Sequence, residues 1–150
     1  MHQQIRLRLG VMEGSDGAGA MTTTAVEVDP ILVRKSLLDV LDTLAENGYD
    51  LEMVGGRDIE GAGEFIFAVD DRKTMACAQL LKDKGFKGVR IVEPAHGHAS
   101  HGPGGLAAAI RKLDVGNRRI HEIFIGIEED GEIPFQVTTI AHSTEKTAAS

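Results

Sequence analysis

The chain has 150 residues, of which 42% are hydrophobic, and its formal net charge is −7. This composition predicts a globular chain and excludes general disorder, and the length is sufficient for a core that needs neither disulfides nor metal. The negative balance, with no basic cluster beyond pairs such as Arg118-Arg119, argues against nucleic acid and against an anionic membrane surface as partners.

No apolar run is long enough to span a bilayer, and the segment from Met1 to Leu9 lacks the apolar region of a signal peptide. The single cysteine, Cys77, has no partner for an internal disulfide. The sequence therefore predicts a cytoplasmic protein, and it predicts Cys77 to be a packed thiol within a helix, because no histidine lies nearby in sequence to activate it.

The first twenty residues carry two opposing signals. Residues 13–20 are rich in Gly and Ala and resemble a flexible linker. Before them, Ile5, Leu7 and Leu9 alternate with polar residues, which is the pattern of a strand. Residues 1–20 are therefore expected to be either a disordered leader or a short edge strand.

A regular series of elements begins at residue 22. Thr22 to Val28 is rich in β-branched residues and predicts the first strand. Asp29-Pro30 is a typical helix start, and apolar residues then recur at helical spacing until Gly48. Alternation from Tyr49 to Met53 predicts a second strand, followed by a turn bracketed by Gly55-Gly56 and by Gly61 to Gly63.

The next three elements complete a sandwich. Phe65 to Val69 predicts an inner strand that is apolar on both faces. Asp70-Asp71 caps a second helix that ends at Lys84 before Gly85, with Met75, Ala78 and Leu81 pointing inward. Val89 to Val92 forms the fourth strand. The order βαββαβ over residues 21–94 predicts an α/β fold of the α+β sandwich type, ferredoxin-like with a mostly antiparallel sheet.

The remaining chain repeats part of this order. A His/Gly loop from Ala95 to Gly105 precedes a helix carrying Leu106, Ile110 and Leu113 at helical spacing. Ile120 to Ile127 and Ile133 to Ile140 form a hairpin around Glu129-Asp130-Gly131. Residues 95–142 are thus expected to be a partial αββ unit, and residues 143–150 a disordered tail.

Strands that are apolar on both faces require the second face of the sheet to be covered as well. Helices on one side cover only that side, while Phe65 to Val69 is apolar on both. A second subunit or the folded-back segment 95–142 is expected to cover the other face.

The segment with most chemical content is the one from His96 to Leu106. Gly102, Gly104 and Gly105 allow unusual backbone angles next to a helix start, where free N–H groups attract carboxylate or phosphate. The alternative interpretation is a flexible connector. His96, His98 and His101 are weak candidates for a Zn²⁺ or Ni²⁺ site, with Glu93 or His121 as a fourth ligand.

Catalytic arrangements are scarce, since there is neither a Gly-x-Ser-x-Gly sequence nor a Cys/His pair. The acidic runs Asp70-Asp71 and Glu128-Glu129-Asp130 fall at a predicted helix cap and a predicted turn, where capping and solvation account for them. The sequence therefore predicts a protein that is not an enzyme and has no cofactor.

Two stretches resemble the ACT-domain family of small βαββαβ modules. The first runs from Ser36-Leu-Leu-Asp-Val-Leu through Glu64-Phe-Ile-Phe-Ala-Val to Leu80-Leu-Lys-Asp-Lys-Gly-Phe-Lys-Gly-Val89. The second, His101-Gly-Pro-Gly-Gly-Leu106, is similar to the family's Pro-Gly-x-Leu turn between its first strand and first helix.

The resemblance implies a regulatory module that binds an amino-acid-like ligand between two units. By position, the implied ligand residues are those of the turn and those at the start of the second strand of a partner unit: His101, Gly102, Pro103, Gly104, Gly105, Leu106, Tyr49, Asp50 and Leu51. The first unit has Asp29-Pro30-Ile31 in place of the glycine turn. The second unit lacks the second helix and fourth strand, and Val89 to Val92 would double as its first strand.

The functional expectation is a small-molecule-binding, allosteric regulatory protein that assembles as a homo-oligomer, a homodimer being the simplest case. The alternatives are a ligand-free ferredoxin-like module for oligomerisation or partner docking and, more weakly, a metal sensor that uses the histidine loop.

Overall fold

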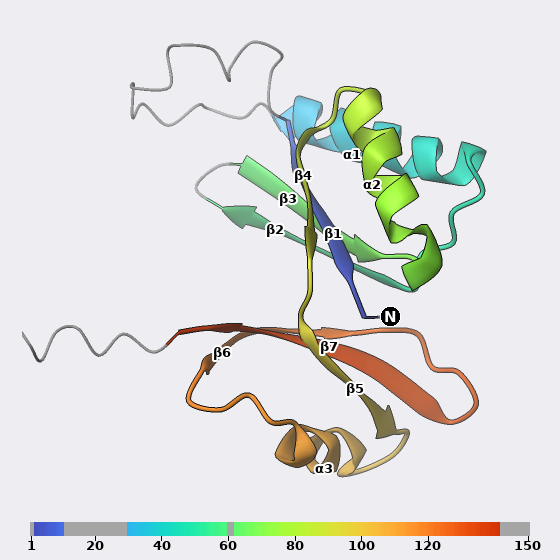
Figure 1. Cartoon of the computed structure of the whole chain (residues 1–150). Helices are drawn as coiled ribbons and strands as arrows, with labels where there is room; N and C mark the ends of the chain where they lie inside the picture. The colour runs from blue at the N-terminus through green and yellow to red at the C-terminus, as the bar shows by residue number, and fades with distance from the viewer. Residues whose placement is uncertain (1, 11–29, 60–61, 142–150) are drawn as a thin grey trace, which may run out of the picture. The chain divides into compact units, whose positions relative to one another are not determined.

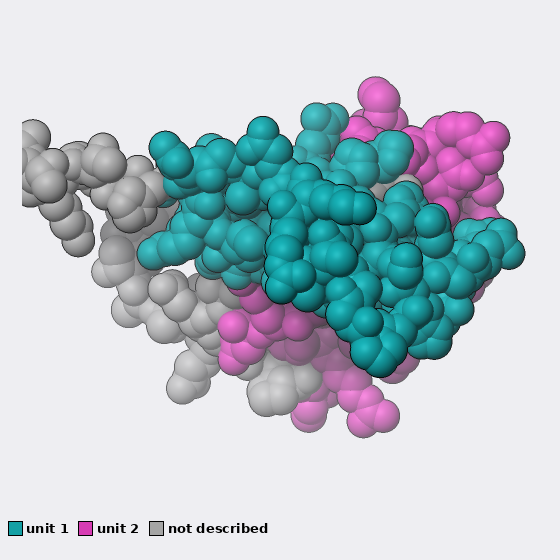
Figure 2. All heavy atoms as spheres, turned by 90° about the horizontal axis from the view of Figure 1, so that it is seen from below, with its two compact units in different colours: residues 1–2, 93–150 teal, residues 3–92 magenta. Residues whose placement is uncertain are grey.

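The structure, a computed structural model, describes residues 2–10, 30–59 and 62–141, and these form two compact units. Unit 2 comprises Gln3–Val92, and unit 1 comprises residues 1–2 with residues 93–150 (Figure 2). The predicted strand Thr22 to Val28 and the predicted tail 143–150 lie outside the described residues, as do residues 11–20 of the predicted leader.

Unit 2 has the element order expected of a ferredoxin-like sandwich (Figure 1). Its elements are β1 (Gln4–Leu9), α1 (Pro30–Glu46), β2 (Met53–Ile59), β3 (Ala62–Ala68), α2 (Thr74–Asp83) and β4 (Lys87–Val92). The four strands form a sheet in the order β2-β3-β1-β4, and each neighbouring pair is antiparallel. The α+β fold with mostly antiparallel sheets is confirmed.

The first described strand of this sheet comes from residues that the sequence assigned to a leader or an edge strand. Residues 4–9 form β1, which is hydrogen-bonded to β3 on one side and to β4 on the other. The expectation of a disordered leader or an edge strand was therefore wrong for these residues. The alternation of Ile5, Leu7 and Leu9 was the correct signal, because these three side chains are buried on one face of the sheet.

The core of unit 2 lies between the sheet and its two helices. Phe67 and Ile5 are fully buried opposite each other on β3 and β1, and helix residues Val40 and Leu81 close the core above them. The inner position of β3 is confirmed, since Phe65 through Ala68 are all buried between β2 and β1.

Two details of unit 2 correct the sequence-based expectations. Gly55 and Gly56 belong to β2, paired with Ile66 and Phe65, rather than to a turn. On α2, Ala78 and Leu81 are buried as expected, but Met75 is 76% exposed. A 3-10 turn over Asp71–Lys73 precedes α2, and the buried stripe of the helix is Thr74, Cys77, Ala78 and Leu81 at spacing i, i+3, i+4 and i+7, which leaves Met75 outside it.

A buried ion pair lies on the sheet face opposite the helices. Arg6 Nη1 is 3.2 Å from Glu64 Oε1, and both side chains are more than 90% buried, with exposures of 7% and 8%. Arg90 Nη2 lies 3.1 Å from the same carboxylate oxygen. Gln4 Oε1 accepts a hydrogen bond from Arg6 Nε, which adds a further polar contact to this buried cluster.

Unit 1 contains β5 (Ala95–Ser100), α3 (Gly105–Lys112), β6 (Arg119–Ile125) and β7 (Glu132–Ile140). Its sheet has the order β5-β7-β6 and is antiparallel throughout. The predicted loop from Ala95 to Gly105 is thus half strand, and β5 is a first strand separate from β4. This strand was not predicted because its histidines and glycine give little β propensity, although Ala95, Gly97 and Ala99 occupy one face of it.

The predicted hairpin is confirmed. Asp130 and Gly131 have φ angles of 53° and 79°, the left-handed values of a two-residue hairpin turn. Glu129 and Glu132 on either side exchange backbone hydrogen bonds of 2.9 and 3.0 Å.

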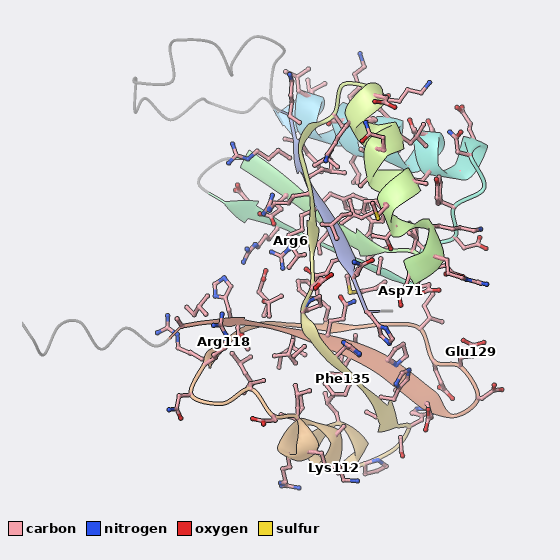
Figure 3. The ribbon with its side chains drawn as sticks, in the orientation of Figure 1. Arg6, Asp71, Lys112, Arg118, Glu129 and Phe135 are labelled. Carbon is pink, nitrogen blue, oxygen red and sulfur yellow. The ribbon has the colours of Figure 1, made fainter. Side chains whose placement is uncertain are left out.

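The core of unit 1 is smaller and is built around Phe135 of β7 (Figure 3). Phe135 and Val137 are buried against Ala99, and α3 contributes Ile110 and Leu113. A Cβ on Gly97 would approach the Phe135 ring to 2.9 Å, so glycine at this position leaves room for the ring.

The two units share one substructure, strand–helix–strand–strand. Each hairpin closes with two residues between its last paired residues, Ile59–Ala62 in unit 2 and Glu129–Glu132 in unit 1. Aligned on these turns, Phe65 and Phe135 take the same place and β1 and β5 pair with their neighbours in the same register, while β6 is displaced by one residue relative to β2. The predicted repetition is present, with β5, α3, β6 and β7 equivalent to β1, α1, β2 and β3.

In the part of the chain that the structure describes, no helix has both the length and the apolar character needed to cross a bilayer.

Candidate functional site

The sequence-predicted turn lies in unit 1 between the end of β5 at Ser100 and the start of α3 at Gly105. Gly102 and Gly104 have φ angles of 126° and 78°, a region that L side chains rarely adopt. A Cβ at either position would meet nothing within 4 Å. These two glycines therefore combine an unusual backbone with open space beside it.

Gly105 is required for a different reason. A Cβ at this position would overlap the carbonyl oxygen of Ser100, so the chain can double back from β5 into α3 only without a side chain here. Gly105 is a packing requirement of the turn, whereas Gly102 and Gly104 leave its outer side open.

The first turn of α3 presents backbone donors at this position. The amides of Gly105 and Ala108 bond to the carbonyls of Gly102 and Gly104, at 3.2 and 3.0 Å. Within the described ranges, no acceptor bonds the amides of Leu106 and Ala107. Such amides attract negatively charged groups, and the helix dipole adds to the attraction.

His101 pairs with Glu128, an acidic residue that was expected to lie in a solvated turn. Its Nδ1 lies 2.9 Å from Glu128 Oε2, and its amide donates to the carbonyl of Gly131 at 3.0 Å. Both side chains are substantially exposed, 62% for His101 and 44% for Glu128. The pair places one cationic and one anionic group side by side when His101 is protonated. The sequence did not predict this pair, because residues 101 and 128 are far apart in the chain and are brought together by the pairing of β5 with β7.

An apolar hollow of about 370 Å³ lies beside this turn. Residues of the turn, β5, β6 and β7 line it: Ala99, Ser100, His101, Gly102, Leu106, Ile125 and Ile133. Leu106 and Ile125 are 39% and 46% exposed, so their apolar surfaces are accessible. Of the predicted ligand residues, the structure brings His101, Gly102 and Leu106 to this hollow; Ile125, Ile133 and Glu128 were missed.

The remaining predicted ligand residues, Tyr49 to Leu51, precede β2 in unit 2. Tyr49 and Leu51 are half-buried against the core of that unit, and Asp50 is exposed. Burial raises the pKa of the Tyr49 hydroxyl, with a smaller contribution from Cys77. Tyr49 and Leu51 thus have a packing role within unit 2.

The candidate metal ligands do not converge. His96 and His98 are exposed on the same face of β5, while the His101 side chain pairs with Glu128. The His96 ring stacks on His2 with ring centroids 4.0 Å apart. Across the described residues, no group of three or more His, Cys, Asp or Glu side chains is placed to hold a metal ion.

Cys77 is fully buried in the core of unit 2, as predicted for a packed thiol. Burial raises the pKa of this thiol to about 11. The neutral thiol is therefore the form present near neutral pH, and it is a poor nucleophile.

Comparison with known proteins identifies the fold only. No protein-family profile matches the sequence, and no curated protein matches it. Protein BT0572 from Bacteroides thetaiotaomicron is similar in structure, with a TM-score of 0.62, 16% identity, and coverage of 99% of this chain and 84% of the other.

Two aspartate kinase structures share the fold at lower scores. The ligand-free regulatory subunit of aspartate kinase from Thermus thermophilus has a TM-score of 0.53 at 14% identity, covering 91% of this chain and 82% of the other. A structure of aspartokinase alpha and beta subunits has a TM-score of 0.52 at 13% identity, with the same coverage. The chain therefore has a fold found in aspartate kinase regulatory subunits, which fits the ACT-like fold that its sequence resembles.

Proposed function

We propose that this chain is an ACT-like regulatory module, without catalytic activity of its own, that binds a small amino-acid-like ligand at the turn from His101 to Leu106. The open glycine turn beside an apolar hollow carries the proposal. It combines three features that an amino acid requires: backbone donors for a carboxylate, an acidic group for an ammonium, and an apolar surface for a side chain.

The proposed binding mode follows from the chemistry of each group. The ligand carboxylate accepts hydrogen bonds from the amides of Leu106 and Ala107 at the start of α3. The ligand ammonium pairs with Glu128, replacing His101 in that contact. The side chain lies against Leu106, Ile125 and Ile133.

Regulation would operate through assembly. By the sequence resemblance, residues 49–51 of a partner copy are expected to lie beside the turn, and Asp50 has the exposed side chain among them. A ligand held between the turn and a second copy would stabilise the dimer by mass action. The surface required for such an assembly would also cover apolar residues of β6 that are now about half exposed, Ile123 and Ile125.

Isothermal titration of the full chain against each common amino acid tests the proposal. We expect heat and a raised melting temperature for at least one of them, and a shift towards dimer when light scattering is recorded with that amino acid. Gly104→Val, which places a branched side chain at a φ of 78°, is expected to remove the response. No heat and an unchanged melting temperature for every amino acid would exclude the ligand.

The second candidate function is a ligand-free docking or oligomerisation module. The exposure of the β6 isoleucines and of Ile127, which is 67% exposed, favours it. Assembly that forms without any amino acid and persists in Gly104→Val would support this function over the first.

A further inference from the structure

Unit 2 contains a larger cavity that the proposed function does not use. It has a volume of about 720 Å³ and lies between α1 and strands β1, β2 and β3. Its walls are predominantly apolar and include Leu9, Val33, Leu37, Leu41, Val54 and Phe65, and the charged residues that border it are Arg57, Asp58 and Glu64. Cavities of about 300–1,000 Å³ with apolar walls and few polar groups are the usual form of small-molecule sites.

This cavity occupies the same place in unit 2 as the hollow beside α3 occupies in unit 1. With Phe65 and Phe135 taken as equivalent residues, their strand partners Gly56 and Ile125 correspond, and Gly63 corresponds to Ile133, two residues before each phenylalanine. Glycine in unit 2 thus replaces two isoleucines of unit 1. The missing side chains account for the larger cavity in unit 2.

A carboxylate lies on the face of β2 that lines this cavity. Val54, Gly56 and Asp58 alternate along β2 and share the helix side of the sheet, because their partners Phe67, Phe65 and Gly63 do. Asp58 is exposed. Arg57 and Glu64, which pair with each other in register, belong to the opposite face by the same alternation, and Glu64 is bonded there by Arg6 and Arg90.

We propose that this cavity is a second ligand site, which binds an amphiphilic amine: an aliphatic or aromatic body within the apolar walls and a cationic head at Asp58. The charge of the site selects the head group, since an anion would meet the Asp58 carboxylate. The volume selects a body larger than the hollow of unit 1 accepts. The net charge of −7 favours the approach of a cation.

Three probes of equal chain length separate the head group from the apolar body: decylamine, decanol and decanoate. They are titrated calorimetrically into the full chain, below their micelle concentrations. We expect decylamine to bind about fivefold more tightly than decanol, as an exposed charge pair allows, and decanoate to bind most weakly. Asp58→Asn is expected to remove the preference for the amine without affecting the melting temperature, because Asp58 is exposed and has no packing role.

Val54→Trp tests the location. Val54 is 55% exposed on an edge strand, so tryptophan is tolerated there while its ring occupies the cavity. We expect decylamine binding to fall at least tenfold. The matched control is Ile123→Trp, at the equivalent position of β6, which is expected to leave decylamine binding unchanged.

The proposal is overturned if decanoate binds as tightly as decylamine, or if Asp58→Asn retains the preference. It is also overturned if Val54→Trp, folded by circular dichroism, binds decylamine as the wild type does. Gly104→Val separates the two sites, because it should leave decylamine binding intact whether or not the turn in unit 1 binds an amino acid.

Discussion

Unit 2 and unit 1 share the arrangement strand–helix–strand–strand, but they differ in what surrounds it. In unit 2, α2 and β4 follow, so β1 is paired on both sides and two helices close the core over Ile5 and Phe67. Among the described residues of unit 1, α3 is the one helix that packs on the sheet, and Ile123 and Ile125 of β6 are about half exposed. The same substructure thus carries a larger buried core in unit 2 and a smaller one, beside half-exposed isoleucines, in unit 1.

This difference determines how substitutions in each unit are expected to affect its stability. The buried residues of unit 2 make many contacts that a substitution would lose, whereas unit 1 depends on a few positions where the backbone itself is constrained. Substitutions in each unit can therefore test whether the two behave as independent folding units.

The largest effect is expected for Gly105→Val in unit 1. Its side chain would overlap the Ser100 carbonyl, so β5 and α3 could not both keep their positions. We expect unit 1 to lose at least about 4 kcal/mol of unfolding free energy. Hydrogen exchange should show lost protection in β5 to β7 and retained protection in β1 to β4. Gly104→Ala, which faces open space, is the matched control and should cost about 1–2 kcal/mol. Equal effects of the two changes would contradict this account of the turn.

The next effect is expected for Glu64→Leu in unit 2. The substitution removes the carboxylate that contacts both Arg6 and Arg90, which should cost about 3–5 kcal/mol of unfolding free energy, measured by urea denaturation. The double variant Arg6→Met/Glu64→Leu removes both charges of the buried pair and should recover most of this loss. If the double variant is no more stable than Glu64→Leu, the loss comes from packing and not from breaking the buried ion pair.

A smaller, pH-dependent effect is expected at Cys77. Its thiol has a pKa of about 11 in the folded chain, above the unfolded value of 9.0, so the folded state holds the proton more tightly. Stability from this group is complete below about pH 9 and falls by up to about 1.4 kcal/mol per pH unit as the pH rises towards 11. Unfolding free energies from pH 7 to 11 should fall more steeply for the wild type than for Cys77→Ala. Parallel curves would show that the thiol titrates normally.

The smallest effect on stability is expected for Glu128→Gln. The pair with His101 is exposed, and exposed pairs contribute about 0–1 kcal/mol to unfolding free energy. We expect the melting temperature to change little, while the amino-acid response of the turn weakens because the ammonium loses its partner. A large loss of stability would instead assign Glu128 a structural role in the hairpin.

Periodicity in the sequence determined the elements that carry their own signal. The stripe of α1 from Pro30, the apolar β3 strand and the turn at Asp130-Gly131 are local patterns, and the structure has all three. The turn from His101 to Leu106 was likewise predicted from its glycines before a helix start. In the structure, Gly102 and Gly104 have positive φ angles. Together these patterns were sufficient for the fold class and for one half of the candidate site.

Only the tertiary structure decided which strands are neighbours. The strand Ala95–Ser100 of unit 1 is too rich in His and Gly to be assigned from propensity, and the alternation in Gln4–Leu9 of unit 2 did not show that this strand lies inside the sheet. β1 is stabilised by pairing with β3, and β5 by pairing with β7. The paired residues are more than thirty positions apart in the sequence, so local propensity does not report this stabilisation. For the same reason the His101–Glu128 pair and the equivalence of Gly56 with Ile125 emerge only when the strands are in register.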